Sequence, residues 1–458
     1  MKKMLVLLAS ALLASAALAQ SDTAADGEYV RKGWSLGVLP CLSYDSDYGF
    51  QFGVLGNVYY FGDGSTYPDY LHNTYFEASS TSKHSDCFRV SYDSKALVPN
   101  HRLSVDLSYL TDAMCDFYGF DGYASTYNPL RADVSSSDYK TRAFYKYHRD
   151  MLRFSADLQG TIAKPWHWNV GAGLQYFKVG SVDVERMNRY GSAADNPLPA
   201  GVNTLLDNYV RLGYISVDEA RGGLTPYLHG GLSYDTRNRE QNPQKGVYAD
   251  AFLTYNLGVG GLRDFSSLQF NAAWRHYITL VPKYLTFAYR LGTQLNLAGR
   301  TPFYQNSIMN QTFFMSNVVF DGVGGGSNVR GLLRSRVLAP GVAYANFEFR
   351  WQIAQFKIKK EMFYLGLNPF MDAGMVVQPY GNVISAASDQ AVSQILSGAE
   401  ASPMMQYADV YRPHLTSGLG LKIAMNDNFI LSIDWAAALD RQDNDGLFNL
   451  YVKMSYLF

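Results

Sequence analysis

The last residues of this chain, 447–458, alternate strictly between apolar and mostly polar side chains, and the sequence stops on an aromatic residue. Because successive side chains of a strand point to opposite faces, such a segment has one apolar and one polar face. This pattern is typical of a transmembrane barrel, whose outer face contacts lipid and whose inner face lines the lumen. The residues expected to face lipid are Phe448, Leu450, Val452, Met454, Tyr456 and Phe458, and those expected to face the lumen are Asn449, Tyr451, Lys453 and Ser455.

The opposite end of the chain, residues 1–19, indicates export. A basic start precedes an apolar run over residues 4–13, and small residues at Ala17 and Ala19 fit a signal-peptidase site. The run is shorter than the roughly 20 residues that a transmembrane helix needs, and no later segment reaches that length. We therefore expect a cleaved signal peptide, a mature chain from Gln20, and a multi-pass β-barrel in the outer membrane, since barrel closure pairs every backbone group within lipid.

Alternation continues backward along the chain and predicts an all-β fold, a transmembrane antiparallel β-barrel of about sixteen strands. Residues 34–44 are a candidate for a seventeenth strand, but both termini should be periplasmic, which favours an even count. We therefore assign residues 20–46 to a short periplasmic segment and residues 47–458 to the barrel. The expected strands are residues 48–61, 73–80, 87–95, 102–111, 141–148, 152–162, 166–178, 224–236, 246–256, 267–280, 284–297, 342–353, 362–376, 414–424, 428–439 and 447–458.

The parity of these strands assigns each connection to one side of the membrane. Residues 179–223, 299–341 and 378–413 fall outside the cell, as long loops of the kind that cover or enter a lumen. Residues 113–140 fall on the periplasmic side, where turns are normally short. That placement conflicts with the usual pattern, and a missed strand near this segment would change the count.

Composition and motifs argue against several other functions. Lys plus Arg (39) nearly balances Asp plus Glu (40), so the chain lacks a global basic field for nucleic acid. We find no phosphate-binding loop, nucleophile elbow or metal-binding histidine spacing, and so expect no catalytic residue, no metal and no cofactor. The three cysteines, Cys41, Cys87 and Cys115, allow at most one disulfide, and we favour packed or unpaired thiols.

Residues 324–331, Gly-Gly-Gly-Ser-Asn-Val-Arg-Gly, are the most distinctive segment of the loop 299–341. Glycines permit positive φ and close backbone approach, so a tight loop tip can push the long side chain of Arg330 into a narrow space. Alternation places two carboxylates of the following strands, Glu348 and Asp372, on the lumen side. A planar guanidinium can donate hydrogen bonds to both carboxylates, so we predict that Arg330 pairs with them inside the lumen.

These motifs, in this order, resemble those of the superfamily of BamA, TamA and the two-partner-secretion transporters, also described as bacterial surface antigen barrels. The lumenal loop of that family carries a Val-Arg-Gly motif, and its next strands carry a Glu and a Phe-x-Asp-x-Gly motif. The resemblance spans roughly residues 224–458 and includes the turn 234–246 and the strand segment 417–420. The matching residues are Gly326, Val329, Arg330 and Gly331 in the loop and Glu348, Phe370, Asp372 and Gly374 in the barrel wall.

The sequence departs from the family in two places. Family members that insert or translocate proteins carry periplasmic POTRA domains before the barrel. Only residues 20–33 precede strand-like sequence here, so we expect a member lacking POTRA domains. Leu332 also replaces the aromatic residue that usually follows the motif. The C-terminal residues Met454, Tyr456 and Phe458, in contrast, resemble the signal that the barrel assembly machinery reads during biogenesis.

Two functions remain open. In the first, implied by the resemblance, the barrel assists outer-membrane assembly or transport of proteins or lipids, with a weak pairing of its first and last strands and a separate periplasmic partner protein. In the second, it is a stable closed barrel that serves as a passive pore, a surface antigen or a docking platform. Outer-membrane lipid and the barrel assembly machinery are expected partners in both cases, and neither an enzyme activity nor a nucleic-acid partner is expected.

Overall fold

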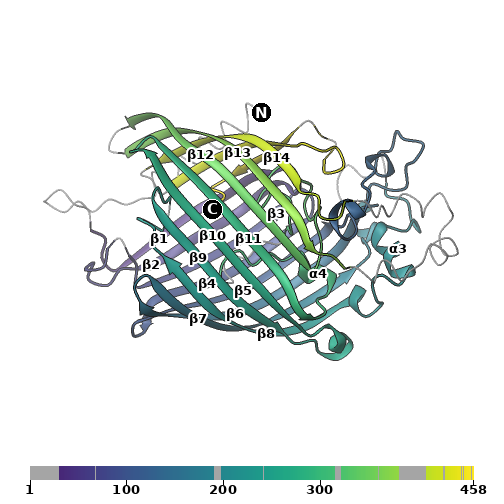
Figure 1. The fold of residues 1–458 in the computed structure, drawn as a ribbon, viewed down its shortest axis with the longest axis horizontal. Helices are drawn as coiled ribbons and strands as arrows, with labels where there is room; N and C mark the ends of the chain where they lie inside the picture. The colour runs from purple at the N-terminus through teal and green to yellow at the C-terminus, as the bar shows by residue number, and fades with distance from the viewer. Residues whose placement is uncertain are drawn as a thin grey trace.

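The computed structural model describes residues 30–67, 69–189, 197–240, 242–314, 321–358, 361–380, 409–425, 429–444, 446, 448–454 and 456–458. Within these residues, sixteen antiparallel strands form one closed barrel, in which sequence neighbours pair and β1 meets β16 (Figure 1). The predicted all-β barrel of about sixteen strands is therefore confirmed. The predicted signal peptide, residues 1–19, and the expected mature start at Gln20 lie outside the described residues.

The strands range from five residues in β16 to eighteen in β6, β12 and β13, and most are long enough to cross a membrane when tilted. Their bounds are β1 Trp34–Asp45, β2 Gly49–Tyr60, β3 His72–Thr81, β4 Ser85–Val98, β5 His101–Asp116, β6 Lys146–Ala163, β7 Trp166–Gly180, β8 Gly222–Asp235, β9 Gly246–Asn256, β10 Ser267–Val281, β11 Leu285–Gly299, β12 Gly341–Ile358, β13 Glu361–Gln378, β14 His414–Met425, β15 Phe429–Ala438 and β16 Asn449–Lys453.

The position expected for residues 34–44, outside the barrel wall, is wrong. These residues belong to β1, and every residue from Trp34 to Asp45 pairs with β2. The even-count argument excluded this strand because the segment around residue 150 had been counted as two strands. The barrel therefore begins at Trp34, before the expected boundary at residue 47.

The expected strands 141–148 and 152–162 are in fact one strand, β6, which stays in register with β5 and β7 through residues 149–151. Arg149 interrupts the apolar pattern because its side chain points into the lumen, where the guanidinium donates to Ser307 Oγ at 2.6 Å. A charged residue that resembled part of a turn is therefore part of the wall.

The barrel gains β1 and loses one strand because two expected strands form β6, so the count stays at sixteen. These two changes move the segment after β5 to the other side of the membrane. Residues 117–145 lie at the same end of the barrel as the long connections 181–221 and 300–340. The expected periplasmic position of residues 113–140 is therefore wrong, which removes the conflict with short periplasmic turns. We refer to the end with the long connections as the extracellular end and to the other as the periplasmic end.

Aromatic side chains pack the extracellular loops into a cap. The described parts of these loops contain three short α-helices, α2 (Val184–Arg189), α3 (Leu205–Arg211) and α4 (Phe303–Asn306), and α3 and α4 are visible at the right of Figure 1. The ring of Phe117 packs edge-to-face on Tyr209 and on Phe303, with centroids 5.1 and 5.6 Å apart. Three loops therefore share one hydrophobic core. No helix among the described residues is long and apolar enough to cross a membrane.

The two faces of the wall differ as the alternation predicts. On the outer face, Trp274 is 42% exposed and Leu228 is 62% exposed, whereas Asn271 and Arg290 on the inner face are completely buried. An apolar outer face suits lipid, and a polar inner face forms a lumen filled by side chains and by the loop 300–340.

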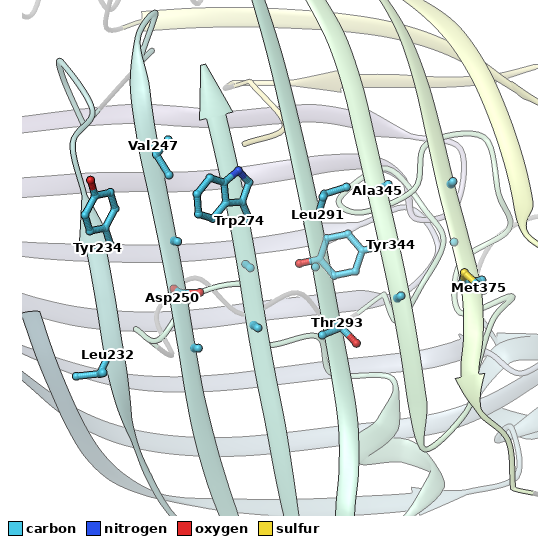
Figure 2. A pocket seen from close by; sticks show the side chains of 18 of the residues that line it. Leu232, Tyr234, Val247, Asp250, Trp274, Leu291, Thr293, Tyr344, Ala345 and Met375 are labelled. Carbon is cyan, nitrogen blue, oxygen red and sulfur yellow. The ribbon is translucent and has the colours of Figure 1, made fainter. Parts of the chain in front are cut away.

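Small side chains leave a hollow on the wall formed by β8 to β13 (Figure 2). Its volume is about 1000 Å³, and its lining includes Ala251, Ala272 and Ala345 as well as the larger Trp274 and Leu291. All five residues follow the outward register of their strands, so the hollow faces lipid rather than the lumen.

Candidate lumenal site

Residues 321–339 leave the cap and run inside the barrel, where most of their side chains are buried. Glycines allow the chain to turn sharply along this path. Gly324, Gly325 and Gly331 have φ values of 133°, 75° and 94°, which side chains other than glycine rarely adopt. The glycine-rich segment therefore forms the loop tip that the sequence predicted.

Two further glycines allow close contact between the loop and the wall. A Cβ atom on Gly326 would lie 2.4 Å from the ring of Tyr451 on β16, and one on Gly374 of β13 would lie 2.4 Å from Val323 Cγ1. Both distances are too short for real atoms, so any side chain at Gly326 or Gly374 would displace the loop. Val329, also predicted as a site residue, is completely buried in an apolar cluster with Val323.

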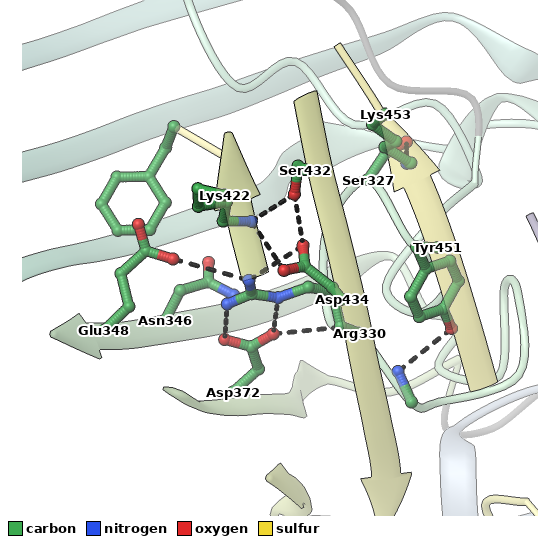
Figure 3. Close-up of polar contacts among 12 residues, drawn as sticks. Ser327, Arg330, Asn346, Glu348, Asp372, Lys422, Ser432, Asp434, Tyr451 and Lys453 are labelled. Carbon is green, nitrogen blue, oxygen red and sulfur yellow. Dashed lines mark hydrogen bonds and ion pairs between the residues drawn. The ribbon is translucent and has the colours of Figure 1, made fainter. Parts of the chain in front are cut away.

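Arg330 binds a carboxylate of the wall through several hydrogen bonds (Figure 3). Its Nε donates to Asp372 Oδ2 at 2.8 Å, its Nη2 donates to Asp372 Oδ1 at 3.1 Å, and its backbone N–H also donates to Oδ2 at 3.1 Å. This is the bidentate geometry in which guanidinium–carboxylate pairs are strongest. The Arg330 Cζ atom also lies 3.4 Å from the ring centroid of Phe370. In the motif Phe-x-Asp, the Phe370 ring therefore contacts the face of the guanidinium, and Asp372 binds its edge.

Two more carboxylates complete the surroundings of Arg330. Its Nη1 lies 3.5 Å from Glu348 Oε2 and 3.5 Å from Asp434 Oδ2. The pairing predicted with Glu348 and Asp372 is therefore present. Asp434 was not predicted as a partner, because a sequence does not reveal which lumenal residues meet across strands.

The three carboxylates are matched by three cations. Lys422 Nζ lies 2.6 Å from Asp434 Oδ1, and Arg350 Nε lies 2.6 Å from Glu348 Oε1, while Arg330 binds Asp372. All of these side chains are buried or nearly so. Charges removed from water are stable only when paired, so these contacts form one network that fixes the loop against β12, β13, β14 and β15.

Two further arginines of the loop were missed by the sequence reasoning. Arg334 donates to Asp112 Oδ2 and to Asp116 Oδ2, both at 2.7 Å, and thereby joins the loop to β5. Arg336 donates to the main-chain oxygens of Gly122 at 2.8 Å and Ser125 at 3.1 Å, within the cap. The run of arginines directly after the motif was the signal that could have identified them.

The C-terminal residues 456–458 depart from the lipid-facing orientation expected for Tyr456 and Phe458. Strand pairing of β16 ends at Lys453, and residues 456–458 lie on the lumen side. There, Arg350 donates to the main-chain oxygen of Phe458 at 2.6 Å, and its Cζ lies 4.1 Å from the ring centroid of Tyr456. Buried cations attract aromatic faces, which explains why these rings leave the lipid side.

The seam between β1 and β16 is short. Among the residues that the structure describes, two residue pairs join these strands, Tyr44 with Val452 and Asp45 with Tyr451, whereas β1 pairs with β2 over its whole length. Both pairs lie at the extracellular end of β1. Toward the periplasm, residues 34–43 of β1 have no pairing with β16 in the described part of the chain.

The lumenal loop contacts this seam directly. The backbone N–H of Gly331 donates to the Tyr451 hydroxyl at 3.1 Å, and Lys453 Nζ donates to Ser327 Oγ at 2.8 Å. Gly331, predicted as a site residue, thus lies against β16. The motif that carries Arg330 therefore joins the β12–β15 wall to the last strand of the barrel.

The periplasmic turn 236–245 crosses the other end of the lumen. Glu240 pairs with Arg102 of β5 at 3.3 Å, and Asn242 Nδ2 donates to the Tyr364 hydroxyl of β13 at 3.1 Å. The Arg102 guanidinium also lies over the ring of Phe314, 4.7 Å from its centroid, so the lumenal loop reaches the same place. The lumen is therefore obstructed from both ends.

The remaining predicted features concern metals and cysteines. Among the residues that the structure describes, no group of three or more His, Cys, Asp or Glu side chains is arranged to hold a metal ion. Cys41, Cys87 and Cys115 are all free thiols.

The comparisons with known proteins agree with this geometry. A family model described as the Omp85 superfamily domain matches residues 73–458, so that β1 and β2 precede the matched region. Among solved structures, BamA from Haemophilus ducreyi lacking POTRA domains 1–3 is 15% identical, with 93% of this chain and 71% of that chain covered and a TM-score of 0.54. This likeness shows the barrel fold.

Two further solved structures were found. CdiB from Acinetobacter baumannii is 14% identical over 94% of this chain and 61% of that chain, with a TM-score of 0.46. CdiB from Escherichia coli is 9% identical over 95% of this chain and 64% of that chain, with a TM-score of 0.48. This chain thus spans less than two thirds of either CdiB chain. No curated protein is similar enough to match.

Proposed function

Because this chain belongs to the Omp85 superfamily, we propose that it assists the insertion or translocation of proteins or lipids at the outer membrane, and that the β1–β16 seam opens during this process. The family's barrel fold indicates an outer-membrane location, and barrels of this family act as transporters or insertases that work with partner proteins. A separate periplasmic partner that delivers the client belongs to the proposal.

The short seam is the observation that supports this function best. In the described part of the chain, two residue pairs join β1 to β16, and the hydrogen-bonding edge of residues 34–43 of β1 has no described residue of β16 as a partner. An open strand edge is a template on which another strand can add, with main-chain hydrogen bonds providing the affinity. Such an edge within a membrane protein therefore suits the handling of a client segment better than it suits a static wall.

The obstructed lumen gives less support to the alternative function, a passive pore. The loop 300–340 and the turn 236–245 cross the lumen, and Arg102 contacts residues of both. A surface antigen or docking platform would not need an incompletely paired seam. Conductance in planar bilayers distinguishes the pore: a steady, size-limited current through the wild-type protein would favour it.

The decisive experiment covalently closes the seam. Cysteines at paired positions, Tyr44→Cys with Val452→Cys, are placed in a variant whose native cysteines are replaced by alanine. Opposed residues of antiparallel strands lie within the distance range that a disulfide spans. The matched control closes a fully paired position of the wall, Leu228→Cys with Tyr255→Cys.

Each variant is supplied as the only copy in cells, and the outer-membrane protein and lipid content is quantified with and without reductant. We expect oxidation of the seam pair, but not of the control pair, to deplete specific outer-membrane components, and reductant to restore them. An unchanged outer membrane in the oxidised seam variant would contradict the proposal.

A further inference from the structure

A small cavity lies where two extracellular loops meet, away from the lumenal site. Its volume is about 230 Å³, and it is lined by side chains of the segment 131–144 and of the segment 201–208. The polar groups around it are two cations and two amides, from Arg131, Lys140, Asn203 and Asn208, and the ring of Phe144 forms an apolar side.

Arg131 is held firmly in this cavity. It ends a short 3₁₀ turn, Pro129–Arg131, and only 8% of its surface is exposed. Its guanidinium lies over the ring of Phe144, 5.1 Å from the centroid. Its main-chain oxygen accepts hydrogen bonds from the backbone N–H groups of Lys140 at 2.9 Å and Thr141 at 3.3 Å, which brings the two cations to the same side of the cavity.

The charge of Arg131 lacks a counterion within the described residues. Arg330, Arg334 and Arg350 are similarly buried, and each of them pairs with a carboxylate within 2.8 Å. In the same described residues, no carboxylate forms a salt bridge with Arg131 or with Lys140. A buried cation without an anion is unfavourable, so an anion that enters this cavity would relieve that cost.

One amide of the cavity, that of Asn208, is oriented as a donor. Asn208 Oδ1 accepts a hydrogen bond from Arg211 Nη1 at 3.3 Å, which leaves its Nδ2 as the group available to a ligand. A capping box between Thr204 and Asp207 fixes this part of the chain, with the Asp207 backbone N–H donating to Thr204 Oγ1 at 3.3 Å and the Thr204 backbone N–H donating to Asp207 Oδ2 at 2.7 Å. Asp207 is thereby engaged within the turn.

We propose that this cavity binds an anionic group, a phosphate or carboxylate, at the extracellular surface of the protein. The cavity is smaller than the roughly 300–1,000 Å³ of pockets that enclose whole drug-sized ligands, so it suits a charged headgroup or a single charged sugar. Guanidinium and ammonium groups beside amide donors are the chemistry that recognises phosphate. The anion is either free in solution or carried by a phosphorylated glycolipid of the outer leaflet, and this inference does not depend on the proposed transport function.

The test measures anion binding by the full-length barrel at constant ionic strength. Inorganic phosphate is titrated into the protein in detergent, and its binding is measured by calorimetry. In a second measurement, binding of the protein to nanodiscs that contain lipopolysaccharide is compared with its binding to nanodiscs that contain phosphatidylcholine only. Two variants remove one cation each from the cavity, Arg131→Gln and the exposed Lys140→Gln. The matched control, Arg189→Gln, removes an exposed arginine of α2 that pairs with Glu185 outside the cavity.

We expect each cavity variant to weaken anion binding by about tenfold or more, since charge-assisted hydrogen bonds are roughly twice as strong as neutral ones, and the control to bind as the wild type does. Binding of phosphate in detergent supports a free anion, whereas binding only to lipopolysaccharide nanodiscs supports the glycolipid headgroup. The proposal would be overturned if neither phosphate nor lipopolysaccharide nanodiscs bind, or if Arg189→Gln weakens anion binding as much as the cavity variants do. Because Lys140 is exposed, Lys140→Gln keeps the test valid if Arg131→Gln fails to fold.

Discussion

Arg350 of β12 donates a hydrogen bond of 2.6 Å to the main-chain oxygen of Phe458, so the guanidinium that pairs with Glu348 also holds the end of the sequence inside the lumen. Glu348 in turn lies 3.5 Å from Arg330. The lumenal loop and the C-terminal residues therefore share one carboxylate, and a change at either can reach the other.

Removal of Arg350 should release the C-terminal residues. Arg350→Ala breaks the contacts with Glu348, Tyr456 and Phe458, and loss of one partner of a buried pair costs up to about 3–5 kcal/mol. We expect a somewhat smaller loss of stability because Glu348 keeps its contact with Arg330. The heat-modifiability midpoint on gels should fall, and carboxypeptidase should remove the terminal residues faster than in wild type. The exposed control Arg189→Ala should change neither, and an unaltered midpoint in Arg350→Ala would show that this contact contributes nothing.

Arg330 should determine whether the loop stays in place. Arg330→Ala leaves Asp372 without its cation, at a cost of about 3–5 kcal/mol when the pair is fully buried. We expect new protease cleavage between residues 299 and 341 in intact cells and a larger, noisier conductance in planar bilayers. Arg330→Lys should restore only part of the wild-type behaviour, because an ammonium group cannot bind both Asp372 oxygens through a planar fork.

A complementary variant neutralises the carboxylates instead of removing the cation. Glu348→Gln with Asp372→Asn keeps the shape of the site but removes two charges next to Arg330, and should also loosen the loop. If proteolysis and conductance are the same in wild type and all three variants, these residues do not hold the loop.

Glu219 should make the extracellular cap sensitive to pH. It is buried beside α4, where it accepts a hydrogen bond from the backbone N–H of Phe303 at 2.7 Å, and burial raises its pKa to about 7 from the ordinary 4.5. A raised folded-state pKa favours the protonated form, so the stabilisation is complete below about pH 4.5 and is lost as the pH rises through 7. The difference corresponds to roughly 3 kcal/mol.

Glu219→Gln should remove this dependence, because the amide stays neutral and can still accept the hydrogen bond. Hydrogen exchange of the cap loops at pH 5.5 and pH 8 measures the effect once each rate is divided by the intrinsic exchange rate at the same pH: the protection factors of wild type should be lower at pH 8, and those of the variant should be equal at both. Glu185→Gln, whose side chain is 79% exposed, is the control and should behave as wild type. Lower protection factors at pH 8 in Glu219→Gln as well would assign the effect to another group.

Deletion of Phe458 tests the expected assembly signal. We expect lower outer-membrane abundance and periplasmic degradation products, since the terminal aromatic residue resembles the signal that the assembly machinery reads. The ring also packs beside Arg290, 5.1 Å from its Cζ, so the deletion alone does not separate recognition from packing. Arg350→Ala provides the separation, because it keeps Phe458 but loosens it. Equal losses in both variants would mean that packing, rather than recognition, sets the abundance.

The sequence predicted the C-terminal half of the barrel well. Residues 246–256 were predicted as a strand, and β9 has these same bounds, because a regular apolar and polar alternation marks a wall that separates lipid from lumen. Prediction failed at β6 because Arg149 is a lumenal residue that resembles a turn residue. It failed at Tyr456 and Phe458 because apolar alternation cannot reveal buried cations on a distant strand.

The lumenal site was predicted in part for the same reason. Alternation correctly placed Glu348 and Asp372 on the inner face, and the glycine-rich loop indicated Arg330 as the residue that reaches them. Contacts across the lumen, such as Arg334 with Asp112, join positions far apart in the sequence and follow no local period. The sequence therefore predicted which residues face the lumen, but it did not predict which of them pair with one another.

The turn 236–245 has a mechanical consequence for the whole barrel. It connects Arg102 of β5 with Tyr364 of β13, two walls that lie eight strands apart in a ring of sixteen, and so acts as a tie across the diameter at the periplasmic end. The tie divides the circumference into two arcs. The arc from β6 to β12 includes β8 and β9, the two strands that the turn connects. The arc from β14 through β16 and β1 to β4 includes the short β1–β16 junction, so the opening that we propose would leave both contacts of the turn intact.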